Sequence, residues 1–243
     1  MLLGCSPTDW GELETINYPI SGEYHALEIS NAFQVTMSDA VLEPVAIVTI
    51  GEKAHQYVRV EVINGTLYLG IKKWNYTSKD KATVILPESY INDLNVSGAS
   101  SFNGPIDEDN IHMKLSGASR FEGTVNCEKA EVELSGASRF EGTMYSENAE
   151  IELSGASYAN INGYCMEELE IKISGASVLE ADRFPCTNIV GEVSGASHAN
   201  VTCCESLKVD VSGVSEVEYS TPSDECTLKV DCECSGNSSV RPR

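Results

Sequence analysis

Serine hydroxyls recur in this sequence at a spacing that could supply a nucleophile. The tetrapeptide Ser-Gly-Ala-Ser begins at positions 97, 116, 135, 154, 174 and 194, and the variants Ser-Gly-Val-Ser and Ser-Gly-Asn-Ser begin at 212 and 235. A serine nucleophile needs a general base within hydrogen-bond reach and a third group that orients the base. No histidine or acid stands at the same position in every copy. The motif therefore favours a structural turn over a catalytic site.

Carboxylates are the second candidates for chemistry. Acidic residues stand four and two positions before several copies of the motif, and Ca²⁺ prefers about six to eight oxygen ligands of this kind. The weak Ca²⁺ candidates are Glu131, Glu133, Glu150 and Glu152. A pectate-lyase-like enzyme would use such a site, but it would also need an arginine or lysine base nearby. The arginines of the repeats follow the turn, on another face, so a solvated acidic face is favoured and no cofactor is expected.

Cysteines are the third reactive group. The chain has nine, and eight of them lie beyond the first few residues. In an exported protein such cysteines are expected to form disulfides. Stacked coils place equivalent α-carbons about 5 Å apart, inside the range that a disulfide accepts. The expected bridges therefore join Cys165 to Cys186 and Cys204 to Cys226, while Cys127 is expected to be free. Zinc is disfavoured because no Cys-x-x-Cys pair occurs.

The residue directly after each motif varies from copy to copy. Arg120, Arg139, Tyr158 and His198 occupy this position in four of the copies. Stacked above one another, these side chains would form an outward column that suits recognition of an extended partner. A solvated strand face explains the same residues equally well. No Ser/His/Asp or Cys/His set can be assembled around His198.

The elements that would position these residues follow from an alternation before each motif. Positions five, three and one before the first serine are apolar in most copies, as in Ile111, Met113 and Leu115, and polar residues separate them. Strict alternation predicts a strand with one buried face, and the following glycine tolerates the dihedral angles of a tight turn. Successive motifs are 18 to 23 residues apart, a period typical of stacked coils.

The predicted fold is all-β: a single-stranded, right-handed parallel β-helix, or β-solenoid, with coils of about 19–20 residues. Residues 94–243 contain the regular repeats. Residues 13–93 are strand-rich without the motif and are expected to form irregular coils that cap the N-terminal end. Residues 1–12 are expected to be a lipobox-like N-terminus and tether.

The first residues suggest how the protein is held in place. Leu2-Leu3-Gly4-Cys5 resembles the lipobox of bacterial lipoproteins, in which the cysteine is acylated, although a chance cysteine is the alternative. We expect an outer-membrane lipoprotein, exposed at the cell surface and touching the membrane only through its lipid. The net charge of −21 makes nucleic acid and anionic membrane surfaces poor partners.

Three features together resemble a known family. They are Asn64-Gly65-Thr66-Leu67, then Val84-Ile85-Leu86-Pro87, then the serial Ser-Gly-Ala-Ser motifs. This combination resembles the DUF2807 family of Bacteroidetes, putative auto-transporter adhesins with a head GIN domain, over about residues 25–240. The resemblance implies a β-helical fold, no recognised catalytic residues and a role in adhesion.

The expected function is therefore that of a non-catalytic adhesin of the cell envelope, which binds an extracellular glycan or protein along a sheet face. Assembly of the protein into a homo-oligomer is left open by the sequence. The alternatives are a polysaccharide-active enzyme of the pectate-lyase type and a purely structural spacer. The two tryptophans, Trp10 and Trp74, both lie outside the repeats, which disfavours the enzyme.

Overall fold

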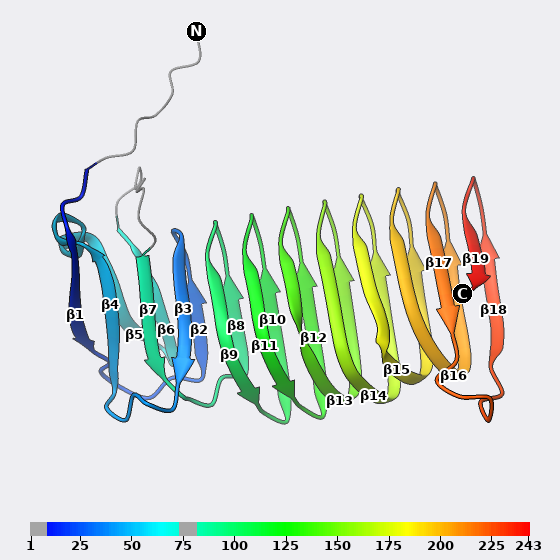
Figure 1. Ribbon diagram of the computed structural model, residues 1–243, viewed down its shortest axis with the longest axis horizontal. Coiled ribbons are helices and arrows are strands. Elements are labelled where there is room, and N and C mark those ends of the chain that lie inside the picture. The colour runs from blue at the N-terminus through cyan, green and yellow to red at the C-terminus, as the bar shows by residue number, and fades with distance from the viewer. Residues whose placement is uncertain (1–8, 73–81) are drawn as a thin grey trace, which may run out of the picture.

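The structure, a computed structural model, describes residues 9–72 and 82–243. Strands account for 65% of the chain and helix for 3%, and the parallel coils stack into a β-solenoid of about 8 turns. Figure 1 shows the coils side by side along one long axis, with the N-terminal strands at one end of the rod and the C-terminal strands at the other. The all-β solenoid predicted from the repeat period is confirmed.

Each regular coil has one strand that leaves the Ser-Gly-Ala-Ser corner and one that returns to the next corner. The strands are β8 (Asp93–Val96), β9 (Ser101–Asp107), β10 (Asn110–Leu115), β11 (Arg120–Asn126), β12 (Lys129–Leu134), β13 (Arg139–Leu153), β14 (Tyr158–Ile173), β15 (Val178–Val193), β16 (His198–Val211), β17 (Glu216–Ser220), β18 (Lys229–Cys234) and β19 (Ser239–Pro242). In β13 to β16 the two strands are continuous. The coils therefore have two sheets, one made of the leaving strands and the other of the returning strands.

Parallel pairing in register stacks equivalent side chains into columns. Leu115 lies opposite Leu134, and Leu134 lies opposite Leu153. The predicted inward row, which is Leu115, Leu134, Leu153, Ile173, Val193 and Val211, is buried throughout. On the other sheet Phe102, Phe121 and Phe140 stack face to face, with ring centroids 5.8 and 4.8 Å apart. These columns form the core, and the alternation in the sequence is what directs them inward.

The N-terminal region differs from the regular coils in its pairing. Its elements are β1 (Leu13–Pro19), β2 (Ala26–Ile29), β3 (Phe33–Ser38), β4 (Val45–Gly51), the 3₁₀ turn η1 (Glu52–Tyr57), β5 (Val58–Ile63), β6 (Thr66–Ile71) and β7 (Ala82–Pro87). Strands β1 and β4 are antiparallel, and β5 and β6 form a hairpin at Asn64-Gly65, where both residues have positive φ. Strand β2 lies between β6 and β8, and β3 lies between β7 and β9. The coil order therefore differs from the chain order.

The corner is a tight turn that depends on glycine and serine. The motif glycines have φ near +75°, as at Gly155 (+76°), a conformation that residues with a Cβ seldom adopt. In several corners the second serine donates its hydroxyl proton to the carbonyl of the first, over 2.8 Å from Ser138 to Ser135 and 2.6 Å from Ser157 to Ser154, and likewise at Ser177, Ser197 and Ser238. These serines close their corners, which agrees with the structural turn predicted from the repeated copies.

Replacing one corner glycine tests this dependence. A Cβ on Gly155 would lie 2.6 Å from the carbonyl oxygen of Gly136 in the preceding coil, and the left-handed conformation costs a residue with a Cβ roughly 1–2 kcal/mol. Gly155→Ala should lower the midpoint of guanidinium denaturation, followed by far-UV circular dichroism. The exposed neighbour offers the matched control Ala156→Ser, which should leave the midpoint nearly unchanged. Equal midpoints for both variants would show that the corner does not need glycine.

Candidate binding surface

The residues that follow each corner form one outward column. In register along the leaving strands lie Ser101, Arg120, Arg139, Tyr158, Val178, His198, Glu216 and Ser239. Arg120, Arg139 and Tyr158 are consecutive in this column, whereas His198 is separated from Tyr158 by Val178. The structure thus brings three of the four predicted recognition residues together and places the fourth two coils away.

Arg139 has two neighbours that hold its side chain. Its guanidinium carbon lies 4.5 Å from the centre of the Tyr158 ring, and its Nη1 lies 3.1 Å from Oε1 of Glu141. The Nη2 of Arg120 contacts the other oxygen of the same Glu141 carboxylate. A cation over a tyrosine ring at an exposed site is worth about 0.5–1 kcal/mol. Both arginine side chains nevertheless remain 48% exposed, so the guanidinium groups are held in place and stay accessible.

His198 lies in a different electrostatic setting. Its Nδ1 is 3.6 Å from a carboxylate oxygen of Glu216, and Arg241 contacts both Glu216 and Glu218 at 2.8 and 2.6 Å. The hydrogen bond from Arg241 lowers the pKa of Glu218. Near His198, at the C-terminal end of the column, the Glu216 and Glu218 carboxylates are therefore paired with the Arg241 guanidinium.

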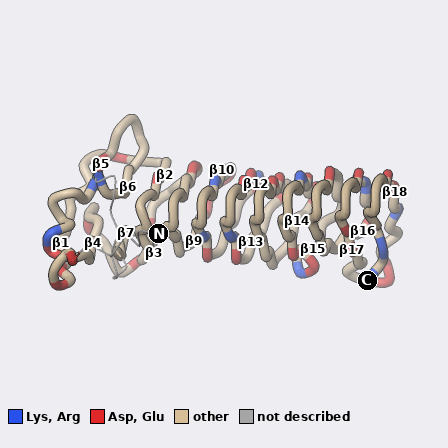
Figure 2. Tube along the Cα trace, turned by 90° about the horizontal axis from the view of Figure 1, so that it is seen from above, with Lys and Arg blue, Asp and Glu red and all other residues tan. Residues whose placement is uncertain are grey.

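The acidic candidates lie on the other sheet. Glu131 lies opposite Glu150, and Glu133 lies opposite Glu152, on β12 and β13. Like charges directly opposite one another destabilise a sheet. Figure 2 shows acidic residues recurring along the rod, with lysines and arginines among them.

Lysines offset part of this repulsion. Lys114 Nζ lies 2.5 Å from Glu133, and its hydrogen bond lowers the pKa of that carboxyl. Lys172 Nζ lies 2.6 Å from Glu150, and this hydrogen bond raises the pKa of the lysine. Two of the four Ca²⁺ candidates are therefore engaged by ammonium groups, and Ca²⁺ binding stays a prediction.

One group on this sheet has the composition of a metal site. His112, Glu131 and Glu133 each offer a ligand atom, and these atoms all lie within 4.8 Å of one another. The Nδ1 of His112 also lies 3.6 Å from Asp93. An imidazole with two carboxylates suits a zinc-type ion better than Ca²⁺, which prefers oxygen ligands. The ammonium group of Lys114 also contacts the Glu133 carboxylate, and its positive charge would repel a metal ion at this position.

The cysteines correct one of the two predicted bridges. A disulfide joins Cys204 to Cys226, with α-carbons 4.9 Å apart. Cys165 and Cys186 lie opposite each other in register but are free thiols. In-register neighbours in a parallel sheet have parallel Cβ vectors about 4.8 Å apart, whereas a disulfide needs Cβ atoms about 3.8 Å apart. The two thiols share a hydrogen bond instead, which lowers the pKa of Cys165 and raises that of Cys186.

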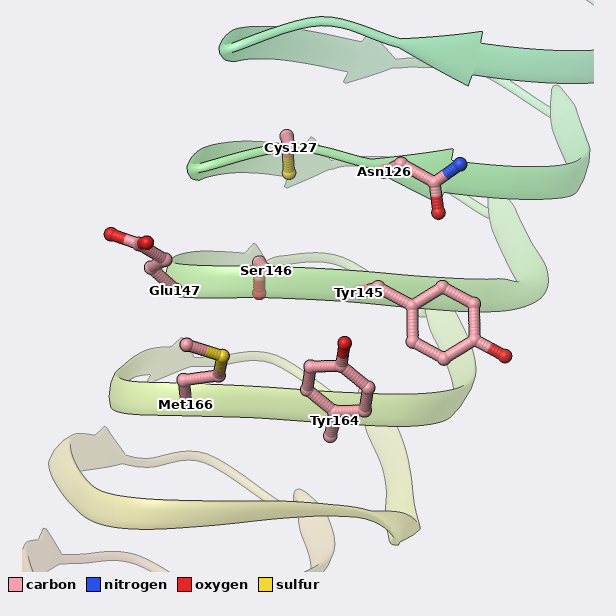
Figure 3. Close-up of a pocket in the computed structure, with 7 residues that line it drawn as sticks. All are labelled: Asn126, Cys127, Tyr145, Ser146, Glu147, Tyr164 and Met166. Carbon is pink, nitrogen blue, oxygen red and sulfur yellow. The ribbon is translucent and has the colours of Figure 1, made fainter.

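A shallow hollow of about 360 Å³ lies where the leaving strands approach the end of the coil opposite the corner. Its lining is Asn126, Cys127, Tyr145, Ser146, Glu147, Tyr164 and Met166. Figure 3 shows the rings of Tyr145 and Tyr164 projecting on the same side from adjacent coils. The ring centroids are 5.0 Å apart and the rings are tilted by 54°. The hollow was not predicted from the sequence.

The repeat does carry a signal for this hollow. Asn126, Tyr145 and Tyr164 are in register, so each stands at the same distance after its corner. The register shifts between Ser146 and Asn148 on β13, that is, at Glu147. Bulges of this kind re-aim side chains and are frequent beside functional sites. A comparison of coil positions near the loop, rather than only near the motif, would have identified the tyrosine pair.

The stacked parallel coils with columns on their outward faces define a β-solenoid repeat protein. A family model described as putative auto-transporter adhesin, head GIN domain (DUF2807) matches residues 23–222. Because the match covers most of the chain, the protein belongs to this family, and the resemblance seen in the sequence is confirmed. Family membership supports an adhesin-like binding role at the cell surface or envelope.

Solved structures share the fold. A putative adhesin from Parabacteroides distasonis ATCC 8503 superimposes with a TM-score of 0.82 at 21% identity, covering 96% of this chain and 98% of that one. A putative lipid binding protein from the same strain gives 0.80 at 19% identity, with 96% and 97% covered. A putative adhesin from Parabacteroides merdae ATCC 43184 gives 0.74 at 17% identity, with 96% and 97% covered. Comparison with curated proteins gives no match.

Two observations bear on the expected membrane anchor. Cys5, the expected lipidation site, lies outside the described residues, as does Trp74. Within residues 9–72 and 82–243, no helix has the length and apolar character needed to cross a bilayer.

Thiol reactivity should separate five of the cysteines into three groups. Cys232 and Cys234 are exposed and should react with iodoacetamide first in the native protein. Cys127 should react slowly, because burial raises its pKa to about 11 and leaves little thiolate at neutral pH. Cys204 and Cys226 should react only after reduction.

Mass spectrometry of alkylated peptides, before and after treatment with dithiothreitol, measures this order. Alkylation of Cys204 in denatured but unreduced protein would contradict the bridge. Resistance of Cys165 to alkylation under the same conditions would restore the predicted pairing with Cys186.

Proposed function

We propose that this protein is a non-catalytic, adhesin-like binding protein of the bacterial cell envelope. It presents an outward sheet face to an extended extracellular partner, a glycan or a protein. The observation that carries the proposal is the column of Arg120, Arg139 and Tyr158. In a chain with a net charge of −21, this column gathers exposed cationic and aromatic groups in register, and arginine and tyrosine are the residues that dominate recognition surfaces.

The repetitive surface favours an extended partner. Coils that repeat the same core and corner leave shallow outward faces, and partners on such faces are held by many weak contacts. The acidic charge of the rest of the rod disfavours nucleic acid and anionic membranes. The column would therefore select a polar or acidic segment of its partner.

The lipid anchor belongs to the same proposal. Acylation at Cys5 would hold the protein to the outer membrane, with the rod projecting from the cell surface. The tether would be shorter than the expected residues 1–12, because Trp10 is buried in the core and its carbonyl accepts a hydrogen bond from Lys53. The membrane would then be touched only through the lipid.

The enzyme and the spacer remain the alternatives to binding. A pectate-lyase-like enzyme would need the Glu133 and Glu150 carboxylates for Ca²⁺, and Lys114 and Lys172 already contact these groups at 2.5 and 2.6 Å. A spacer would need no exposed arginine held over a tyrosine ring. The contacts of Arg139 therefore favour binding over both alternatives.

The binding proposal is tested on an array of glycans and extracellular-matrix proteins with the purified protein. The double variant Arg139→Ser/Tyr158→Ala should lose binding by about tenfold or more, because each removed anchor contributes on the order of 1 kcal/mol. Lys208→Ser removes one exposed cationic side chain from the other sheet and serves as the matched control, with binding unchanged. An equal loss in both variants would show that net charge, rather than the column, governs binding.

Anchoring and catalysis need a separate experiment. Expressed behind a lipoprotein signal, the wild type should incorporate labelled palmitate and Cys5→Ala should not. The wild type should leave polygalacturonate intact with Ca²⁺ present. Cleavage of polygalacturonate that disappears in Glu133→Gln would replace the adhesin proposal by the enzyme.

A further inference from the structure

The hollow around Tyr145 and Tyr164 has features that a solvated loop does not need. Two tyrosines from adjacent coils are 38% and 46% exposed, although their rings lie close enough to form one aromatic platform with centroids 5.0 Å apart. Met166 beside them is 53% exposed. Binding sites for small polar ligands combine such an apolar surface with a few positioned polar groups.

Polar side chains accompany this aromatic platform. Asn126 and Glu147 line the hollow and are exposed. Ser146 is 3% exposed and alternates with Tyr145 along β13, so its hydroxyl faces the interior of the coil beside Cys165. The polar side chains that a ligand can reach are therefore those of Asn126 and Glu147.

We propose that this hollow is a subsite for a neutral glycan. A sugar ring offers an apolar C–H face to an aromatic side chain and hydroxyl groups at its edge, which matches tyrosine rings beside exposed polar side chains. This inference rests on the proposed binding function and names the ligand class for one part of the surface.

The charge of the surroundings selects among glycans. Glu147 lines the hollow, and the whole chain carries a net charge of −21. A uronic acid or a sialic acid would be repelled there. A neutral sugar meets no such repulsion, and its hydroxyl groups can donate to the Glu147 carboxylate.

The register indicates the direction of the ligand. Asn126, Tyr145 and Tyr164 follow one another from coil to coil, about 4.8 Å apart along the rod. A linear chain of sugars lying parallel to the rod axis would contact these residues in turn. The pairing of β13 and β14 has a bulge at the hollow. Glu147 on β13 lies opposite two residues of β14, Met166 and Glu167, so β14 has one extra residue there.

The test uses three neutral hexasaccharides, chitohexaose, cellohexaose and xylohexaose, with hexagalacturonate as the anionic comparator. Binding to the full protein is measured by calorimetry and by saturation-transfer NMR. At least one neutral probe should bind, and Tyr145→Ala and Tyr164→Ala should each weaken it by about tenfold. The control Tyr90→Ala removes an exposed tyrosine elsewhere on the rod and should bind as the wild type.

Several outcomes would overturn the subsite. They are failure of all three neutral probes to bind, binding that is unaffected by both tyrosine substitutions, hexagalacturonate bound as tightly as the neutral probes, and tyrosine-dependent self-association in place of glycan binding. The proposed function is tested separately, by a variant outside the hollow. Arg139→Ser/Tyr158→Ala should retain hexasaccharide binding, so a loss of partner binding in that variant is independent of the hollow.

Discussion

The structure depends on coils that stack with their backbones in direct contact at the corner. A Cβ on Gly117 would lie 2.6 Å from the Gly98 carbonyl oxygen, and a Cβ on Gly136 would meet Gly117 in the same way. From Ala118 onward, the amide nitrogen of each corner alanine donates to the glycine carbonyl of the preceding coil, over 2.7 Å from Ala118 to Gly98. Only glycine permits this approach. Once the corners are fixed, each residue must lie above its equivalent, and the columns follow.

Columns multiply the effect of each side chain. An apolar position repeated in every coil becomes a continuous core, as at Phe102, Phe121 and Phe140. An acidic position repeated in the same way becomes a line of like charges, which Lys114 and Lys172 interrupt. A repeat that builds its core in this way is uniform by design, so specific binding must come from positions that break the repetition.

This division explains what the sequence could predict. Period and alternation are local properties, and they predicted the coils, the buried row from Leu115 to Val211 and the corner role of the serines. The position of β2 between β6 and β8 depends on contacts between distant segments, which periodicity does not encode. The Cys165–Cys186 bridge was wrong because α-carbon spacing was considered without the direction of the Cβ vectors. The tyrosine hollow was missed because its residues lie at the far end of the coil from the motif.

The two proposed contact regions lie on the same sheet. Arg139 and Tyr145 both point outward from β13, and their burial pattern places them on one face. Six residues of strand separate them, which is roughly 20 Å. A partner that follows the rod axis through one column therefore does not reach the other, whereas a branched glycan or a glycosylated protein spans both. Two weak contacts on one rigid sheet would then act together, because the second forms at the effective concentration set by the first. Rigid stacking of the coils thus turns modest side-chain contacts into a surface that holds an extended partner.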